Sequence, residues 1–468
     1  MLRNFVVSAL ILLPLLAAAQ QSSPAKAAEP VLPYSPSLNV NDMDRTADPC
    51  VDFYTYSCGG WMKSNPIPPD QSSWAVYSKV YEDNLAFLRA ILEQAAVEKD
   101  RDAVTQKIGD YYAACMDEAK VESLGAKPLQ PDLQAIASLK STNELAPLIA
   151  KLQLSGVGAL FASGPEQDPD NSDAMIVDFA QGGLGLPDRD YYLKDDAKSK
   201  ETRERYLQHV QKVFELLGDS PATAKQNAAT VMRMETGLAK ASLTRVERRD
   251  PYKQKHKMSP AEFARIAPDF QWNAFLTAVQ VPNVEVLNVS WPAFFQEVNS
   301  QLKSVSLNDW KNYLRFHVAN SSAPYLSSAF VNEDFAFYRQ YLRGAKELRP
   351  RWKRCVQYVD DDLGEALGQV YVRKTFSPET KAATVDMTRR IEDAMALRIQ
   401  QLDWMSPATK QQALTKLHAI RNKVGYPDKW RDYSSVNIVA DDFYGNTLRA
   451  TEFETHRQFN KVGKPVDR

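Results

Sequence analysis

Signals for helix starts recur along this chain and constrain its fold more than any other feature. A serine is followed by a proline at Ser220-Pro221, Ser259-Pro260, Ser377-Pro378 and Ser406-Pro407. The serine hydroxyl can accept a hydrogen bond from a free backbone N–H at the helix start, and proline fits the first helical position because no N–H is needed there. Each pair therefore predicts the beginning of an α-helix.

The apolar spacing extends this prediction to long helices. The longest is predicted over 378–402, with Val385, Ile391, Met395, Ile399 and Leu402 facing inward, and the next runs from Pro407 to Gly425. Another is predicted over 74–96, where apolar side chains recur at steps of three and four: Tyr77, Val80, Tyr81, Leu85, Leu88, Ile91 and Leu92. Ser141 and Glu144 are spaced as a capping box before a helix over 145–154, which Gly156 ends.

Strand signals are few. Two short apolar runs, 159–162 and 174–179, flank a polar stretch that contains Pro165, Asp170 and Asn171, which predicts a β-hairpin. The fold class that follows is mainly α: a large multi-helix lobe with a small β-hairpin.

The charge balance excludes one class of function. The chain has 57 basic and 58 acidic side chains, a formal net charge of −1, whereas a protein that binds nucleic acid through a basic face needs an excess of Lys and Arg. Hydrophobic residues make up 44% of the chain, enough to form a packed core.

The first residues are typical of an export signal. Arg3 precedes an apolar run from Phe5 to Leu16 that closes on three alanines, and about 20 residues are needed to span a bilayer. Residues 1–19 are therefore interpreted as a cleaved signal peptide, with an uncleaved membrane anchor as the alternative. Residues 20–43 are rich in Ala, Ser and Pro and are predicted to be a flexible linker. We expect an exported protein, periplasmic or secreted, with no membrane contact after cleavage.

An oxidising compartment allows the four cysteines, Cys50, Cys58, Cys115 and Cys355, to form disulfides. Four cysteines permit three pairings, and their spacing does not choose among them.

Motifs for catalysis are missing from the sequence. A catalytic zinc helix needs two histidines four residues apart, but Val213, Pro260, Ser321, Asn422 and Asn460 stand four places after the five histidines. Asp360, Asp361 and Asp362 could form a metal cluster, yet consecutive side chains on a helix diverge, so a polar face is favoured. Asp168, Asp170 and Asp173 are interpreted as a solvated turn, and Asn288 and Asn320 begin glycosylation sequons that matter only in a glycosylating cell.

Seven segments in order resemble the neprilysin and endothelin-converting enzyme family of zinc metallopeptidases. They are Asp48–Trp61 with Asn65 and Ile67-Pro68, Tyr112–Met116, Gly183–Tyr192, Arg249–Pro251, Arg351–Cys355, Leu402–Met405 and Gly425–Pro427. The resemblance covers about residues 44–428, which it implies are the family's N-terminal helical domain, with 429–468 leading toward the catalytic domain.

In that family a thermolysin-like lobe follows and supplies a His-Glu-x-x-His zinc helix, and zinc activates water to hydrolyse oligopeptides. None of these motifs occurs before Arg468. The resemblance therefore implies a chain without its zinc lobe: no catalytic or metal-binding residue is assigned and no bound zinc is expected. The expected partners are the missing C-terminal catalytic domain and, in the intact enzyme, an oligopeptide substrate.

The resemblance also implies a disulfide between Cys115 and Cys355, which closes a loop of 240 residues and contributes about 5 kcal/mol in the chain-entropy model. It leaves Cys50 and Cys58 without their usual partners, although a local bridge between them stays open. Where many members of the family carry an arginine, this chain has Ser73. The aromatic residues Trp74 and Tyr77 that follow are candidates for substrate contact. Their helical spacing makes the core or a domain contact the alternative.

Two functional hypotheses follow. The first is the helical lobe of an exported neprilysin-like zinc metalloendopeptidase, inactive alone. The second is a stand-alone peptide-binding or scaffold protein that lacks the chemistry. The second requires a stable fold despite two thiols without partners and an apolar surface where the zinc lobe is missing.

Overall fold

The computed structural model describes residues 31–33 and 39–467. The predicted signal peptide, 1–19, and most of the predicted linker lie outside these residues. From the linker, Val40–Asp42 forms a turn of 3-10 helix (η1) that contacts α1. No helix in the described part of the chain is both long and apolar enough to cross a membrane.

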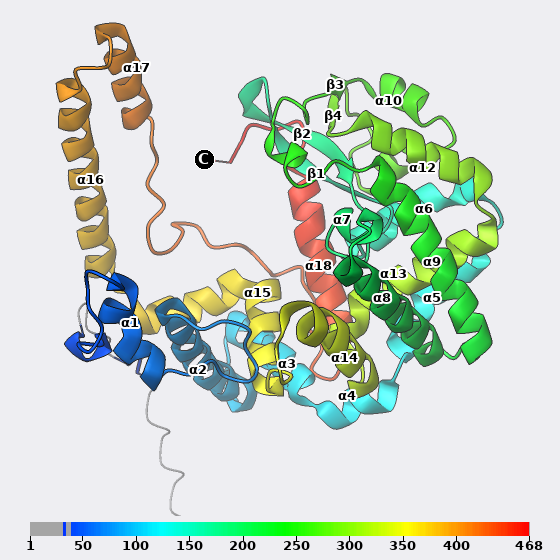
Figure 1. Cartoon of the computed structure of the whole chain (residues 1–468), viewed down its shortest axis with the longest axis horizontal. Coiled ribbons are helices and arrows are strands. Elements are labelled where there is room, and N and C mark those ends of the chain that lie inside the picture. Colours follow the sequence, from blue (N-terminus) through cyan, green and yellow to red (C-terminus); the bar gives the residue numbers. More distant parts are fainter. Residues whose placement is uncertain (1–30, 34–38, 468) are drawn as a thin grey trace, which may run out of the picture.

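The architecture is a large assembly of helices with one small sheet (Figure 1). The first half contains α1 (Phe53–Ser64), α2 (Val76–Val97), α3 (Ala103–Met116), α4 (Glu118–Leu124), α5 (Gln130–Ser138), α6 (Leu145–Leu154), β1 (Phe161–Asp168), β2 (Asn171–Gln181), α7 (Asp190–Leu193), α8 (Ala197–Leu216) and α9 (Pro221–Ala241). The second half contains β3 (Lys257–Met258), α10 (Pro260–Ile266), α11 (Trp272–Ala278), β4 (Leu287–Val289), α12 (Pro292–Ser304), α13 (Leu307–Ser322), α14 (Ser328–Asp334), the π-helix η6 (Phe335–Tyr341), α15 (Arg351–Thr375), α16 (Pro378–Gln401), α17 (Pro407–His418) and α18 (Phe443–Phe459). The mainly α fold predicted from the sequence is confirmed.

Two hydrophobic cores hold the assembly together. The larger contains buried residues between Leu129 and Phe337, together with Tyr444 and Phe459. It is centred on aromatic side chains of the sheet and of α10 to α12, such as Phe161, Phe179 and Phe295. The smaller lies where α2, α3 and α15 pack together, and it includes Cys115 and Cys355. Helix α18 contributes to both cores, with Tyr444 in the larger and Phe443 in the smaller.

The predicted hairpin is confirmed and belongs to a four-stranded sheet with the order β1-β2-β4-β3. Strands β1 and β2 are antiparallel, with Phe161 opposite Gln181, while β4 runs parallel to β2. Near the end of the chain, the N–H of Val466 donates to the carbonyl of Asp173, so this segment extends the pairing of β2. The polar turn of the hairpin is tied down by ion pairs of Asp168 and Asp170 with Lys257.

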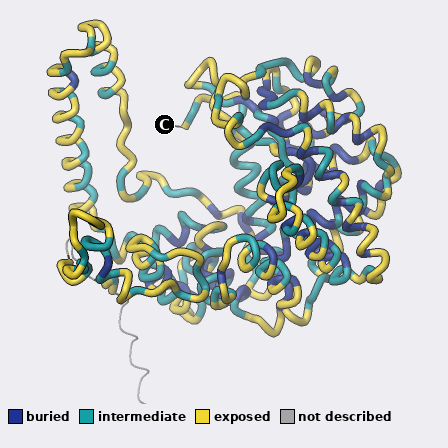
Figure 2. The backbone as a smooth tube through the Cα atoms, in the orientation of Figure 1, coloured by how far each residue is buried: buried dark blue, intermediate teal, exposed yellow. Residues whose placement is uncertain are grey.

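Helices α16 and α17 form an arm that stands apart from the body of the molecule (Figure 1), and residues 419–442 return from it to α18. Most of the arm is exposed or half-buried (Figure 2). Ile399 is the single buried residue of α16, and α17 has none.

The helix-start signals are confirmed at all four Ser-Pro pairs. Each serine accepts a hydrogen bond from the N–H three residues later, and Ser259 forms a full capping box with Glu262. The capping box predicted at Ser141 is wrong, because residues 142–144 form a 3-10 turn and Ser141 makes no capping bond. The predicted end of the next helix at Gly425 is also wrong, since α17 ends at His418.

Two predicted buried stripes are only partly correct. In α2, Leu85, Ile91 and Leu92 are buried, but Tyr77, Val80 and Tyr81 near its start are exposed. In α16, the predicted inward face is wrong at Ile391, which is 60% exposed, and at Met395, which is 49% exposed. Val385 and Leu402 are half-buried, and Ile399 is buried. The periodicity is helical in both cases, but periodicity does not reveal whether a partner covers the apolar face.

The segment Gly183–Tyr192 is a structural part of the larger core. Gly183 has φ of +70°, and a Cβ there would lie 2.7 Å from Leu160 Cα, so only glycine fits. The carbonyl of Gly183 accepts a hydrogen bond from the Tyr313 hydroxyl at 2.8 Å, and the Tyr192 hydroxyl donates to Glu235 at 2.8 Å.

Glu235 is fully buried at the centre of this region. The hydroxyls of Tyr192 and Tyr206 both donate to its carboxylate, and burial raises the pKa of each tyrosine, so both stay protonated donors. His317 Nε2 lies 3.0 Å from Glu235 Oε1 but out of line for a hydrogen bond. The carboxylate thus organises polar groups contributed by α7, α8, α9 and α13.

We expect Glu235→Leu to lower the free energy of unfolding by about 3 kcal/mol, because it leaves buried tyrosine hydroxyls without an acceptor. Glu235→Gln keeps one acceptor oxygen and should cost less. Urea unfolding followed by circular dichroism measures both, with the exposed Glu204→Leu on α8 as the matched control. Equal effects of the two leucine variants would contradict this role of Glu235.

Candidate functional site

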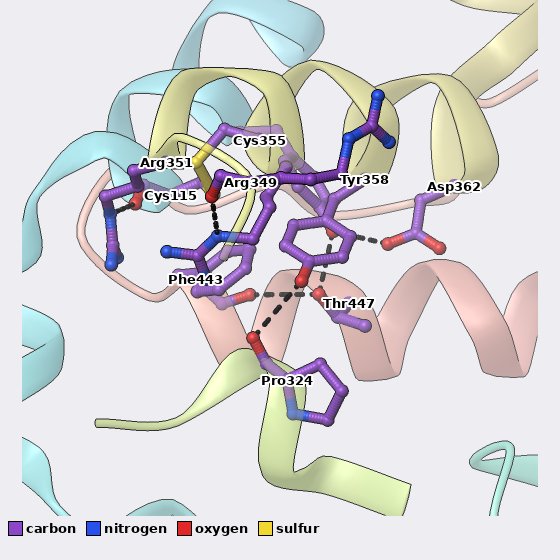
Figure 3. Close-up of a disulfide and its surroundings, with 11 residues drawn as sticks. Cys115, Pro324, Arg349, Arg351, Cys355, Tyr358, Asp362, Phe443 and Thr447 are labelled. Carbon is purple, nitrogen blue, oxygen red and sulfur yellow. Dashed lines mark hydrogen bonds between the residues drawn. A yellow bond between two sulfur atoms is a disulfide. The ribbon is translucent and has the colours of Figure 1, made fainter. Parts of the chain in front are cut away.

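The junction of α3, α15 and α18 brings together Cys115, Cys355 and Asp362 (Figure 3). Cys115, near the end of α3, and Cys355, in the first turns of α15, are joined by a disulfide across 240 residues. Arg351 Nε donates to the carbonyl of Cys115 at 2.8 Å, and the Tyr358 hydroxyl donates to the carbonyl of Pro324 at 3.2 Å. These contacts fix the start of α15 against α3.

Asp362 lies about two helical turns after Cys355 on α15, and its side chain faces the inside of the junction. It accepts a short hydrogen bond from the buried Tyr111 hydroxyl of α3, which also lies 2.7 Å from the Thr447 hydroxyl of α18. Burial raises the pKa of Asp362 to about 7, and the Tyr111 hydrogen bond opposes this only in part. Asp360 and Asp361 are exposed, as the predicted polar face requires, whereas Asp362 is half-buried and bonded to Tyr111.

The described residues do not fit a zinc ion. Nowhere in them do three His, Cys, Asp or Glu side chains come together as a metal site. His209 uses both ring nitrogens in contacts at 2.9 Å, with Glu333 and with Asn320, and His317 lies against Glu235. We therefore derive no chemical step through a metal.

The asparagines of both glycosylation sequons make side-chain hydrogen bonds within the fold. Asn288 is buried in β4, and its side chain bonds to Asp178 and to the carbonyl of Gln254. The Asn320 side chain bonds to His209 and Tyr338. Asn288 is buried, whereas Asn320 is half-buried.

The aromatic candidates lie at the surface. Tyr77 is 87% exposed at the start of α2, and Trp74 is half-buried just before it. Cys50 is exposed and Cys58 is half-buried, and both carry free thiols with no bridge between them. Trp74 and Tyr77 are candidates for the core on their helical spacing, and Tyr77 is not in the core.

Large apolar side chains are exposed on α1 and on α16. On α1 they include Phe53 and Tyr54, which are 68% and 67% exposed, and on α16 they include Met387, Ile391 and Met395. Each of these three residues is four positions from the next, so their side chains form one stripe along the helix. Single exposed apolar residues are common on protein surfaces, but a stripe on a helix that stands apart from the body indicates a contact surface.

Comparison with known proteins places this geometry in a family. A model described as Peptidase family M13 matches residues 49–427. The chain belongs to peptidase family M13. This confirms the resemblance to the neprilysin and endothelin-converting enzyme family of zinc metallopeptidases.

Relatives in the M13 family include endothelin-converting enzyme 1 of Rattus norvegicus, 30% identical over 449 residues, which cover 92% of this chain and 58% of that protein. An endothelin-converting enzyme homolog of Locusta migratoria is 30% identical to this chain, which covers 62% of that protein. The crystal structure of the Mycobacterium tuberculosis zinc metalloprotease Zmp1 in complex with an inhibitor superposes with a TM-score of 0.85 at 33% identity, covering 92% of this chain and 65% of that one. The chain thus spans less than two thirds of the length of these M13 relatives.

We expect Asp362→Asn to stabilise this M13 chain near neutral pH by about 2 kcal/mol, since asparagine still accepts from Tyr111 without a buried charge. The sign follows from the raised pKa of Asp362: the folded state holds its proton more tightly, so wild-type stability is lost as the pH rises from about 4 to about 7.

Urea unfolding at intervals between pH 4 and pH 8 measures this, with the exposed Asp386→Asn of α16 as control. The stability gap between Asp362→Asn and the wild type should open over that range. A gap that is constant with pH, or that opens equally for the control, would contradict a buried titrating Asp362.

Proposed function

We propose that this chain is the N-terminal helical lobe of an exported, neprilysin-like zinc metalloendopeptidase, and that as given it does not hydrolyse peptides. The observation that carries the proposal is the combination of an M13 match over residues 49–427 with a sequence in which no two histidines are four residues apart. In the proposed intact enzyme, a further lobe supplies the zinc site and the catalytic base, and oligopeptides are the substrates.

The exposed apolar stripe of α16 supports docking of that further lobe. Met387, Ile391 and Met395 are each about half exposed or more. Fully burying such side chains is worth about 1.5–3 kcal/mol each, so a partner of matching shape gains affinity there. Tyr77 and the aromatic residues of α1 add to the surface that this lobe would contact.

We also propose that residues 1–19 direct export, to the periplasm or out of the cell, and that 20–43 link the signal to residues 44–428. The disulfide between Cys115 and Cys355 supports an oxidising destination, because such bonds persist outside the reducing cytosol. Cys50 and Cys58 remain free for the family's partners in the further lobe.

The purified 468-residue chain should hold less than about 0.1 zinc per molecule after dialysis and should not cleave an internally quenched oligopeptide, because a catalytic zinc needs three protein ligands in one place. Metal analysis and fluorescence measure these, with the intact mycobacterial zinc metalloprotease as the positive control. Cleavage that a chelator abolishes would contradict the proposal.

A thiol count combined with calorimetry tests the alternative of a stand-alone binding protein. For a lobe that lacks its partner, we expect two free thiols per chain and concentration-dependent association through the exposed apolar surface. Replacing Met387, Ile391 and Met395 together by glutamine should reduce this association without lowering the melting temperature. A monodisperse chain with a cooperative transition and no free thiol would favour the stand-alone protein.

A further inference from the structure

Two of the three residues in the apolar stripe of α16 are methionines. Met387 is 56% exposed and Met395 is 49% exposed, and each lies four positions from Ile391, which stands between them on the helix. The arm that carries them stands apart from the body of the molecule (Figure 1). Solvent and small dissolved molecules therefore reach both thioether side chains.

Exposure of this degree is rare among the methionines of the chain. Within the described residues, Met62 on α1 is the one other exposed methionine, at 50%. Met234 in α9 is buried, and the rest are half-buried: Met43, Met116, Met175, Met232, Met258 and Met405. Because exposure governs how readily a side chain is oxidised, a dissolved oxidant should react first with Met62, Met387 and Met395.

The reaction open to an exposed methionine is a two-electron oxidation by a peroxide. A lone pair of the thioether sulfur attacks one oxygen of hydrogen peroxide, so that an S–O bond forms while the O–O bond breaks. The proton on the transferred oxygen passes to the departing hydroxide, which leaves as water. The product is methionine sulfoxide, in which a flexible apolar side chain has become polar, and sulfoxide reductases can reverse the change.

We propose that Met387 and Met395 form an oxidation site that controls whether the apolar stripe of α16 can dock. This inference rests on the docking role that the proposed function gives to the stripe. The two methionines lie eight positions apart, which is about 12 Å along the helix at 1.5 Å per residue. Sulfoxides at both ends leave Ile391 as the one apolar member of the stripe.

The effect on docking follows from the cost of burying a polar group. A sulfoxide oxygen that is pressed into an apolar interface loses its hydrogen bonds to water and finds no donor there, which opposes docking. Methionine-rich interfaces are disrupted by this oxidation for the same reason. The disulfide between Cys115 and Cys355 is typical of an oxidising environment, in which the reaction can occur.

Brief treatment of the full chain with hydrogen peroxide, followed by peptide mass mapping, tests the site. Cys50 and Cys58 are alkylated beforehand, so that the thioethers are the groups left to react. We expect Met387 and Met395 each to gain one oxygen at least about 5-fold faster than the half-buried Met232. Equal rates at exposed and half-buried methionines would overturn the proposal.

Retention on a hydrophobic-interaction column measures the polarity of the stripe without any partner. The oxidised wild type should elute earlier than the untreated chain, and sedimentation should show self-association weakened at least about 5-fold. The double variant Met387→Leu, Met395→Leu keeps the apolar volume but has no sulfur in the stripe, so the same treatment should change neither property. An equal change in the double variant and the wild type would overturn the proposal.

The matched control is Met62→Leu, which removes the exposed methionine of α1 and should leave the response to peroxide as in the wild type. Protection by Met62→Leu instead of by the α16 pair would show that the site is wrong. Retention that is unchanged after both α16 methionines are oxidised would overturn this inference alone. A chain that never associates, oxidised or not, would contradict the docking role of the stripe in the proposed function.

Discussion

The disulfide between Cys115 and Cys355 is the constraint on which the rest of the structure depends. It fastens α3 to the start of α15, and nearly all of the larger core lies within the 240 residues between them. That core therefore folds inside a covalently closed loop, and closing a loop of this length removes about 5 kcal/mol of entropy from the unfolded chain. Helix α18, which follows the loop in sequence, packs against both cores and joins them.

Buried carboxyl groups organise the two cores in different ways. Glu235 in the larger core accepts hydrogen bonds from two buried tyrosines. Asp362 in the smaller core has one such donor, and burial raises its pKa to about 7. A carboxylate with fewer hydrogen-bond donors is less well compensated for its lost hydration, so burial raises its pKa more. The ionisation of Asp362 therefore makes the stability of the junction of α3, α15 and α18 depend on pH.

The arm and a cavity beside η6 differ in the chemistry of their surfaces. The apolar stripe of α16 is uncovered and suits a large protein surface, whereas the cavity beside η6 is enclosed by four stretches of chain and carries both signs of charge.

The sequence by itself determined several helix starts, one hairpin and the family. Local chemistry sufficed for the helix starts at the four Ser-Pro pairs, because an N-cap depends on residues three apart, and for the β1–β2 hairpin, whose strands are joined by a short turn. Only the tertiary structure decided which apolar faces are covered. Leu85 and Met395 follow the same helical spacing, yet Leu85 is buried in the smaller core while Met395 is 49% exposed. The cavity had no signal in the sequence for the same reason: Ser72, Tyr325, Arg343 and Asp361 meet only after the chain has folded.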